Sequence, residues 1–115
     1  MISGIVFEQG EILIVPFPFS DLSSIKQRPV LVLSKIDYNK NADDIITCGI
    51  TSNLKDSNYS VLIENKDLER GEIPIVSRIK VDKLFTINKI IVKKSVGKVK
   101  KHIIEAAKKE LVSLI

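Results

Sequence analysis

The stretch QRPVLVLS (residues 27–34) places an arginine and a proline directly before a run of aliphatic residues. Apolar side chains fill consecutive positions from Val30 to Leu33, so an extended segment here would be buried on both faces. A proline is accepted at the first position of a strand, because no N–H is needed there for the ladder. Residues 29–34 are therefore predicted to form a core strand, with Arg28 directly before its first residue.

Segments on either side predict further strands. EILIVPFPF (11–19) is apolar on both faces, and its prolines are expected to end the strand. IITCGITS (45–52) is a third strand, with a bulge or sharp bend expected at Gly49. The alternating or apolar segments 59–64, 75–85 and 89–97 complete the predicted set, and the polar segments 20–27, 35–44 and 65–74 are expected to be loops and connectors.

The last segment, KVKKHIIEAAKKELVSLI (98–115), changes to a helical period. Its apolar residues recur every three or four positions, which predicts an amphipathic helix: Ile103, Ile104, Ala107, Leu111 and Leu114. Lys98, Lys100 and Lys101 would lie in the first turn without a good N-cap, where the helix dipole disfavours cations. The pattern as a whole predicts one domain over residues 1–115, a small mainly β barrel with one appended helix.

Charge is distributed unevenly along the chain. Residues 1–79 hold 8 Lys and Arg against 11 Asp and Glu, whereas residues 80–115 hold 10 Lys against 3 Asp and Glu. The basic last third would attract a polyanion or an acidic protein segment, although a simply solvated tail fits the charge equally well.

The single cysteine, Cys48, has no partner within the chain and lies in an apolar stretch, as expected of a small core residue in a reducing compartment. Glu8 and Glu11 interrupt the start of the chain, and no secretory signal pattern is visible. No apolar run reaches the roughly 18 residues that a membrane span needs. We expect a cytoplasmic protein that makes no membrane contact.

Several kinds of catalytic site are absent from the sequence. It has no P-loop, no G-x-G-x-x-G and no nucleophile elbow. His102 is the only histidine, which excludes a catalytic histidine pair within one chain, and a surface or packing role suits it better. Asp43 and Asp44 have no further ligand at suitable spacing, so they read as a solvated turn. We expect no metal and no other cofactor.

The order of GEILIVPFPF, QRPVLVLS, IITCGITSN, VSRIKVDKLF and VGKVKKHIIEAAKKEL resembles the MazF/PemK family of toxins from bacterial and archaeal toxin–antitoxin systems. The resemblance runs from about Gly10 to the final helix. It implies an SH3-like barrel of the CcdB/PemK kind with a C-terminal helix, working as a homodimer. It also implies sequence-specific, metal-independent cleavage of single-stranded RNA (mRNA interferase activity) that a cognate antitoxin restrains. The catalytic residues that it implies are Arg28, in the R-P motif, and Thr51, in the I-T-S motif.

Both residues suit cleavage by attack of the RNA 2′-OH on the adjacent phosphorus. The planar guanidinium of Arg28 could donate to two phosphate oxygens at once and stabilise the charge of the phosphorane. The hydroxyl of Thr51 could donate to the same phosphate. The structural alternatives are an Arg28 that caps the barrel through an ion pair and a Thr51 that simply ends a strand.

RNA-binding candidates flank these two residues. The hydroxyl-rich segment 19–27 has the composition of a loop that clamps phosphates or unstacked bases, and it contributes Phe19, Ser20, Lys26 and Gln27. Phe19 could stack on a base, and a place at the edge of the core is equally open. Ser52 and Asn53 could read base edges, and Arg78 could add a phosphate contact. This loop lacks the glycine-rich stretch of better-known family members, which leaves the cleavage sequence open.

Two other functions compete with the nuclease. One is a non-catalytic module that binds DNA or RNA through the lysine-rich last third. The other is a toxin of the same barrel family that inhibits DNA gyrase by protein contact. The gyrase inhibitors do not share the R-P and T-S motifs, so the presence of Arg28 and Thr51 favours the nuclease.

Overall fold

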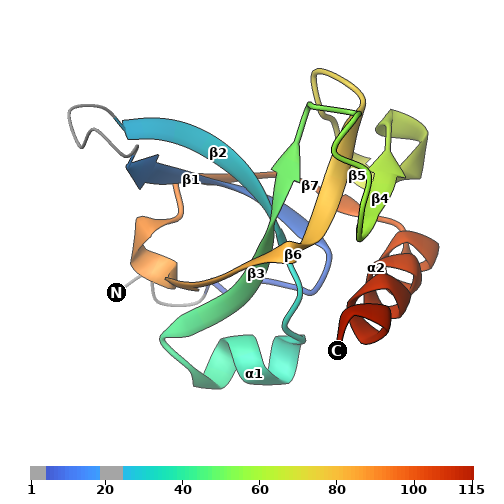
Figure 1. Cartoon of the computed structure of the whole chain (residues 1–115). Coiled ribbons are helices and arrows are strands. Elements are labelled where there is room, and N and C mark those ends of the chain that lie inside the picture. The colour runs from blue at the N-terminus through green and yellow to red at the C-terminus, as the bar shows by residue number, and fades with distance from the viewer. Residues whose placement is uncertain (1–4, 19–24) are drawn as a thin grey trace.

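Seven antiparallel strands form one sheet in the order β4-β6-β3-β2-β1-β7-β5, and the sheet bends into a half-barrel (Figure 1). This computed structural model describes residues 5–18 and 25–115. The strands are β1 (Glu11–Pro18), β2 (Ile25–Val32), β3 (Asp44–Thr51), β4 (Ser60–Ile63), β5 (Leu68–Gly71), β6 (Ser77–Asn88) and β7 (Lys94–Val99). The helices are α1 (Ile36–Asn41) and α2 (Lys101–Leu114), with 3-10 turns η1 (Asn65–Asp67) and η2 (Lys89–Ile91). The predicted mainly β fold with a C-terminal helix is confirmed.

Residues 11–15 of β1 and 30–32 of β2 are buried or half-buried on both faces, as their apolar runs predict. Ile12 and Leu31 belong to one core cluster, which also includes Ile103 and Ala107 of α2. The neighbouring side chains alternate to the other face, where a second cluster contains Leu13, Val15, Val30, Val32, Phe7, Ile45 and Ile87. Side chains of a strand point alternately to opposite faces, so a sheet packed on both sides needs such continuous apolar runs.

Helix α2 covers one face of the sheet and packs against β4 and β6 (Figure 1). It begins at Lys101, and the preceding Lys100 provides no side-chain cap, as predicted. The expectation that Lys98 lies in the first helical turn is wrong, because this residue belongs to β7. Its ammonium there forms ion pairs with Glu8 at 3.3 Å and Glu69 at 3.6 Å.

Other local expectations need correction. Pro16 lies inside β1 rather than ending it, since β7 pairs with β1 only as far as Ile14 and loses no ladder bond to this proline; Pro18 is the last residue of β1, as expected. Residues 25–27, expected in a loop, open β2. The polar segment 35–44 contains α1, and the connector 65–74 contains β5. None of the helices in the described part of the chain has the length and apolar character of a membrane span.

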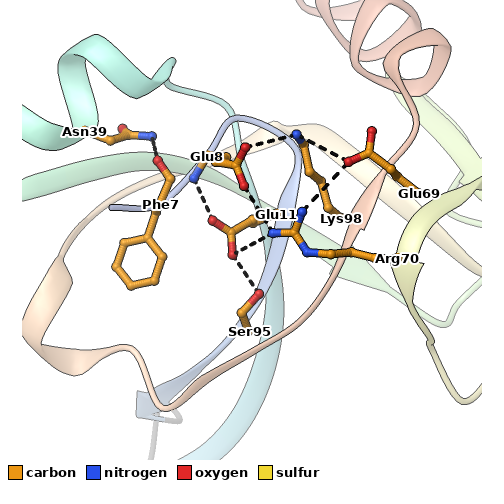
Figure 2. A network of polar contacts seen from close by, with 8 residues as sticks. All are labelled: Phe7, Glu8, Glu11, Asn39, Glu69, Arg70, Ser95 and Lys98. Atoms are coloured by element: carbon orange, nitrogen blue, oxygen red, sulfur yellow. Dashed lines mark hydrogen bonds and ion pairs between the residues drawn. The ribbon is translucent and has the colours of Figure 1, made fainter. Parts of the chain in front are cut away.

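A polar network fixes the segment before β1 to strands β5 and β7 (Figure 2). Glu11 is buried, and its carboxylate accepts hydrogen bonds from the backbone N–H of Glu8 at 2.6 Å and from Ser95 Oγ at 2.8 Å. Arg70 lies 3.2 Å from Glu8 and 3.7 Å from Glu11. The hydrogen bond and positive charge of Lys98, followed by those of Arg70, lower the pKa of Glu8. This network holds the barrel together on the side of β5 and β7.

Candidate functional site

Arg28 lies on β2, exposed, and opposite Val15 of β1. On its other side β2 pairs with β3 from Val30–Gly49 to Val32–Thr47. The same register continued by two residues puts Arg28 opposite Thr51. Pro29 has no N–H to donate to β3, and the β2–β3 ladder starts only at the next residue, Val30.

Thr51 is the last residue of β3 and is half-buried. Its Oγ1 accepts a hydrogen bond from the backbone N–H of Asn53 at 3.1 Å, which forms a tight turn at the strand end. A threonine hydroxyl both donates and accepts, so this turn leaves the O–H of Thr51 able to donate. By the continued register, the two predicted catalytic residues belong to the same face of the neighbouring strands β2 and β3.

Arg78 lies on the other side of Thr51, which it pairs with across the β3–β6 ladder. Its Nε donates to the carbonyl oxygen of Leu54 at 2.7 Å, and its Nη1 donates to Ser60 Oγ at 3.3 Å. These bonds occupy two of the five N–H donors of a guanidinium. The guanidinium is thus held against the 52–59 segment. By strand register, Arg28, Thr51 and Arg78 form one row across β2, β3 and β6.

An aromatic pair lies on the same face and was not among the predicted residues. The rings of Phe17 and Phe85 have centroids 4.8 Å apart and are tilted by 43°. A side chain at Gly49 would contact Phe85 Cε2 at 3.7 Å, so the ring covers this glycine between Thr47 and Thr51. The predicted irregularity at Gly49 is confirmed, because the β3–β6 register shifts between Cys48 and Gly49.

The other predicted RNA-binding residues are distributed around this row. Lys26 lies opposite Phe17 and, two residues from Arg28, shares its face of β2. Gln27 lies opposite Pro16 and belongs to the other face, so the strand does not bring it together with Arg28. Ser52 and Asn53 are exposed in the turn after Thr51. Phe19 and Ser20 fall outside the residues that the structure describes.

Lys80 is a further residue of this region that the sequence pattern did not single out. It is 2 % exposed and is the largest fully buried side chain among the described residues. In the sequence it is one polar residue of the alternating segment 75–85, on a face expected to be accessible. Lys80 differs from the other polar residues of this segment only in being covered by another part of the fold, and the alternating sequence pattern does not predict that burial.

Features elsewhere in the molecule remain separate from this row. His102 is 66 % exposed on α2 and lies 3.7 Å from Asp67, which agrees with the expected surface role. A hollow of about 420 Å³ is lined by residues 64–66 and 73–76, and by none of the predicted site residues. Within residues 5–18 and 25–115, no group of three or more His, Cys, Asp or Glu side chains could hold a metal ion. The expected independence from a metal ion stays a prediction.

Known proteins with a similar sequence pattern and fold match almost the whole chain. The family model of the PemK-like, MazF-like toxin of type II toxin–antitoxin systems matches residues 8–115. No curated protein sequence matches the chain.

Solved structures with the same fold share low sequence identity with it. A MazE–MazF structure from Deinococcus radiodurans (Form-III) has a TM-score of 0.78 at 18% identity and covers 96% of both chains. The Mycobacterium tuberculosis toxin MazF-mt6 has a TM-score of 0.72 at 18% identity, over 90% of this chain and 93% of its own. A mycobacterial endoribonuclease in complex with its cognate antitoxin has a TM-score of 0.74 at 17% identity, over 93% and 92%. The extent of the family match settles the assignment: the chain belongs to the PemK-like, MazF-like toxins of type II toxin–antitoxin systems.

Proposed function

We propose that this toxin is a sequence-specific endoribonuclease that cuts single-stranded RNA without a metal ion. The observation that carries the proposal is the row of Arg28, Thr51 and Arg78 on one face of three adjacent strands. A guanidinium and a hydroxyl on the same face of neighbouring strands are suited to one phosphate group. The endoribonuclease named among the structural neighbours supports the same activity.

The reaction begins with attack of the RNA 2′-OH on the adjacent phosphorus. The bond from the 2′-oxygen to phosphorus forms, the bond to the 5′-oxygen of the next nucleotide breaks, and the proton lost by the 2′-OH is balanced by one delivered to the leaving 5′-oxygen. Charge develops on the non-bridging oxygens of the phosphorane as the new bond forms. Arg28 stabilises this charge through two parallel N–H donors, since a guanidinium stays protonated at neutral pH. Thr51 donates its O–H to the same phosphate. The products are a 2′,3′-cyclic phosphate and a free 5′-hydroxyl.

Substrate contacts come from the residues around the row. The exposed Phe85 and its partner Phe17 offer an aromatic surface on which an unstacked base can lie. Ser52 and Asn53 offer hydrogen-bonding groups beside Thr51, and Lys26 offers positive charge on the face of Arg28. An A-form duplex would keep its bases paired and stacked, so a site of this kind favours single strands. The predicted contacts from Phe19, Ser20, Gln27 and Arg78 stay part of the proposal.

The proposed partners are a cognate antitoxin and a second copy of the chain. The basic last third, with 10 Lys against 3 Asp and Glu, suits an acidic antitoxin segment. Exposed apolar side chains on β3, β6 and η2 offer a surface for a homodimer: Ile46, Leu84, Ile90 and Ile91. The antitoxin complexes among the structural neighbours support the first partner.

The test is cleavage of single-stranded RNA by the purified protein in EDTA, with break sites mapped by primer extension. We expect Arg28→Ala to lower the cleavage rate by about 1,000-fold while the fold survives. Lys101→Ala is the matched control, because it removes the same charge from the exposed start of α2. Products with a 3′-hydroxyl would exclude attack by the 2′-OH. A parent that binds RNA without cutting it, with binding retained by Arg28→Ala, would instead indicate a non-catalytic binding module.

A further inference from the structure

The ammonium of Lys80 is buried between two carboxylates and a carbonyl. Its Nζ lies 2.9 Å from Asp56 Oδ1 and 3.5 Å from Asp82 Oδ1, and it donates a hydrogen bond to the carbonyl oxygen of Asn58. A buried charge is costly unless it is paired and hydrogen-bonded, so these contacts are what allow Lys80 to be there. Two of the three partners, Asp56 and Asn58, belong to the segment 52–59.

This segment crosses over β6. Strands β3 and β4 flank β6 in the sheet, and the chain leaves β3 at Thr51, opposite Arg78, and enters β4 at Ser60, opposite Lys80. Two strand spacings amount to about 10 Å, which the segment spans in one short loop. Connections between parallel strands are usually longer, so this one has few residues of its own with which to form a stable structure.

Side chains from β6 hold the crossing loop from below. Arg78 and Lys80 are two residues apart and project from the same face. Arg78 donates to the carbonyl oxygen of Leu54, near the start of the loop, and Lys80 binds Asp56 and Asn58, toward its end. Tyr59 then turns into β4 with a φ of 49°. The loop is therefore fixed at both halves, immediately after the Thr51 turn.

Titration does not weaken this anchor in neutral solution. Burial lowers the pKa of Lys80, but the hydrogen bond to Asp56 and the negative charges of Asp82 and Asp56 outweigh it and raise that pKa above its ordinary value. Lys80 therefore carries its charge across the whole range in which an RNA-cleaving enzyme would work.

We propose that the Lys80–Asp56 ion pair positions the Thr51 turn relative to Arg28, so that Lys80 is a positioning residue for the proposed cleavage reaction. The inference rests on the proposed function. Lys80 itself is covered by the loop and touches no substrate. It acts through the loop, whose displacement by about 1 Å would be enough to lower the rate of a reaction that depends on alignment by about 100-fold.

The kinetic test compares Lys80→Met, Asp56→Ala and the double variant in cleavage of single-stranded RNA. Each single variant is expected to lower kcat by about 10- to 100-fold and to change KM by less than about 3-fold. The kcat of the double variant is expected to be no lower than that of the less active single variant, because both substitutions break the same ion pair. Lys98→Met is the control, since it removes a half-buried lysine with two ion pairs on β7. Folded single variants with the parent's kcat would overturn the proposal.

A second readout separates this inference from the proposed function. Amide hydrogen exchange in residues 52–59 is expected to be at least about 10-fold faster in Asp56→Ala than in the parent, with exchange in β1 and β2 unchanged. Asp56 is 44% exposed, so this variant carries the test if Lys80→Met does not fold. Unchanged loop exchange would overturn the anchor. A parent that cuts no RNA would overturn the proposed function alone, and loop exchange would still decide whether the pair holds the loop.

Discussion

Thr51 and Arg78 lie directly opposite each other at the end of the β3–β6 ladder. Residues paired in this way share one face of the sheet, so the hydroxyl and the guanidinium are neighbours. Arg78 also donates to the carbonyl oxygen of Leu54 in the loop and to Ser60 Oγ, and Ser60 lies on β4, on the far side of β6 from Thr51. One arginine thus has two candidate roles, as a contact for an RNA phosphate and as an anchor for the 52–59 loop.

Replacing Arg78 with methionine separates the two roles. Loss of the bonds to Leu54 and Ser60 is expected to lower the free energy of unfolding by about 1 kcal/mol, measured by urea denaturation. Loss of a phosphate contact would instead weaken RNA binding and reduce the slope of log K against log salt by about 1. We expect the stability effect in any case and the change in slope only if Arg78 touches RNA. Unchanged stability would contradict the anchoring role.

The hydroxyl of Thr51 is expected to matter more than its shape. Thr51→Val keeps the volume and removes the donor, and we expect the rate of RNA cleavage to fall by about 100-fold. Thr51→Ser keeps the hydroxyl and its bond to the Asn53 N–H, and is expected to stay within about 10-fold of the parent. Single-turnover cleavage measures both. Equal rates for the two variants would show that the hydroxyl takes no part.

The sequence patterns predicted the elements whose burial is continuous. Apolar runs in residues 11–19 and 29–34 identified the two central strands, because both faces of each are packed. The six-residue helix α1 and the short strand β5 escaped detection, since neither has an apolar period of its own. Helix α1 instead depends on tertiary contacts such as that of Asn39, a fully buried residue whose amide donates to the carbonyl oxygens of Phe7 and Ser34.

The site was partly predictable for a related reason. Arg28 and Thr51 belong to short motifs, one within β2 and one at the end of β3, and the register of the two strands then assigns them to one face. The burial of Lys80 and the ring pair of Phe17 and Phe85 arise from contacts between strands distant in sequence. Residue types in an alternating strand do not reveal that a loop will later cross over one of them.

Gly71 is expected to be intolerant of any side chain. Its φ is 77°, and a Cβ there would lie 2.0 Å from the carbonyl oxygen of Val96. Backbone strain and the clash with β7 together predict that Gly71→Ala lowers the free energy of unfolding by about 2–5 kcal/mol. Gly49→Ala is the control, because its Cβ would have contacts no closer than 3.5 Å. Urea denaturation that finds the two variants equally stable would contradict this account.

Cys48 is expected to resist thiol reagents while the protein is folded. It is fully buried, and burial, with a smaller contribution from the charge of Asp82, raises the pKa of its thiol to about 12. The thiolate is the reactive form, so labelling at pH 8 should be at least about 100-fold slower than in urea. Cys48 is the only cysteine, and any label therefore reports on this site. Rapid labelling of the folded protein would show that the sheet opens at β3.

Glu8 is expected to make stability depend on pH in the acidic range. Lys98 and Arg70 hold its pKa below the ordinary value of 4.5, so its contribution is complete above pH 4.5 and is lost as the pH falls through the lower folded value. Glu8→Gln should therefore be less stable than the parent at pH 7, by less than about 1 kcal/mol for this half-exposed group, and the difference should shrink as the pH falls below 4.5. Urea denaturation at low salt measures the difference, and 1 M salt should reduce it. Glu105→Gln, on the exposed face of α2, is the control. A difference between parent and Glu8→Gln that stays constant from pH 7 to pH 2 would mean that the ion pairs to Glu8 do not stabilise the fold.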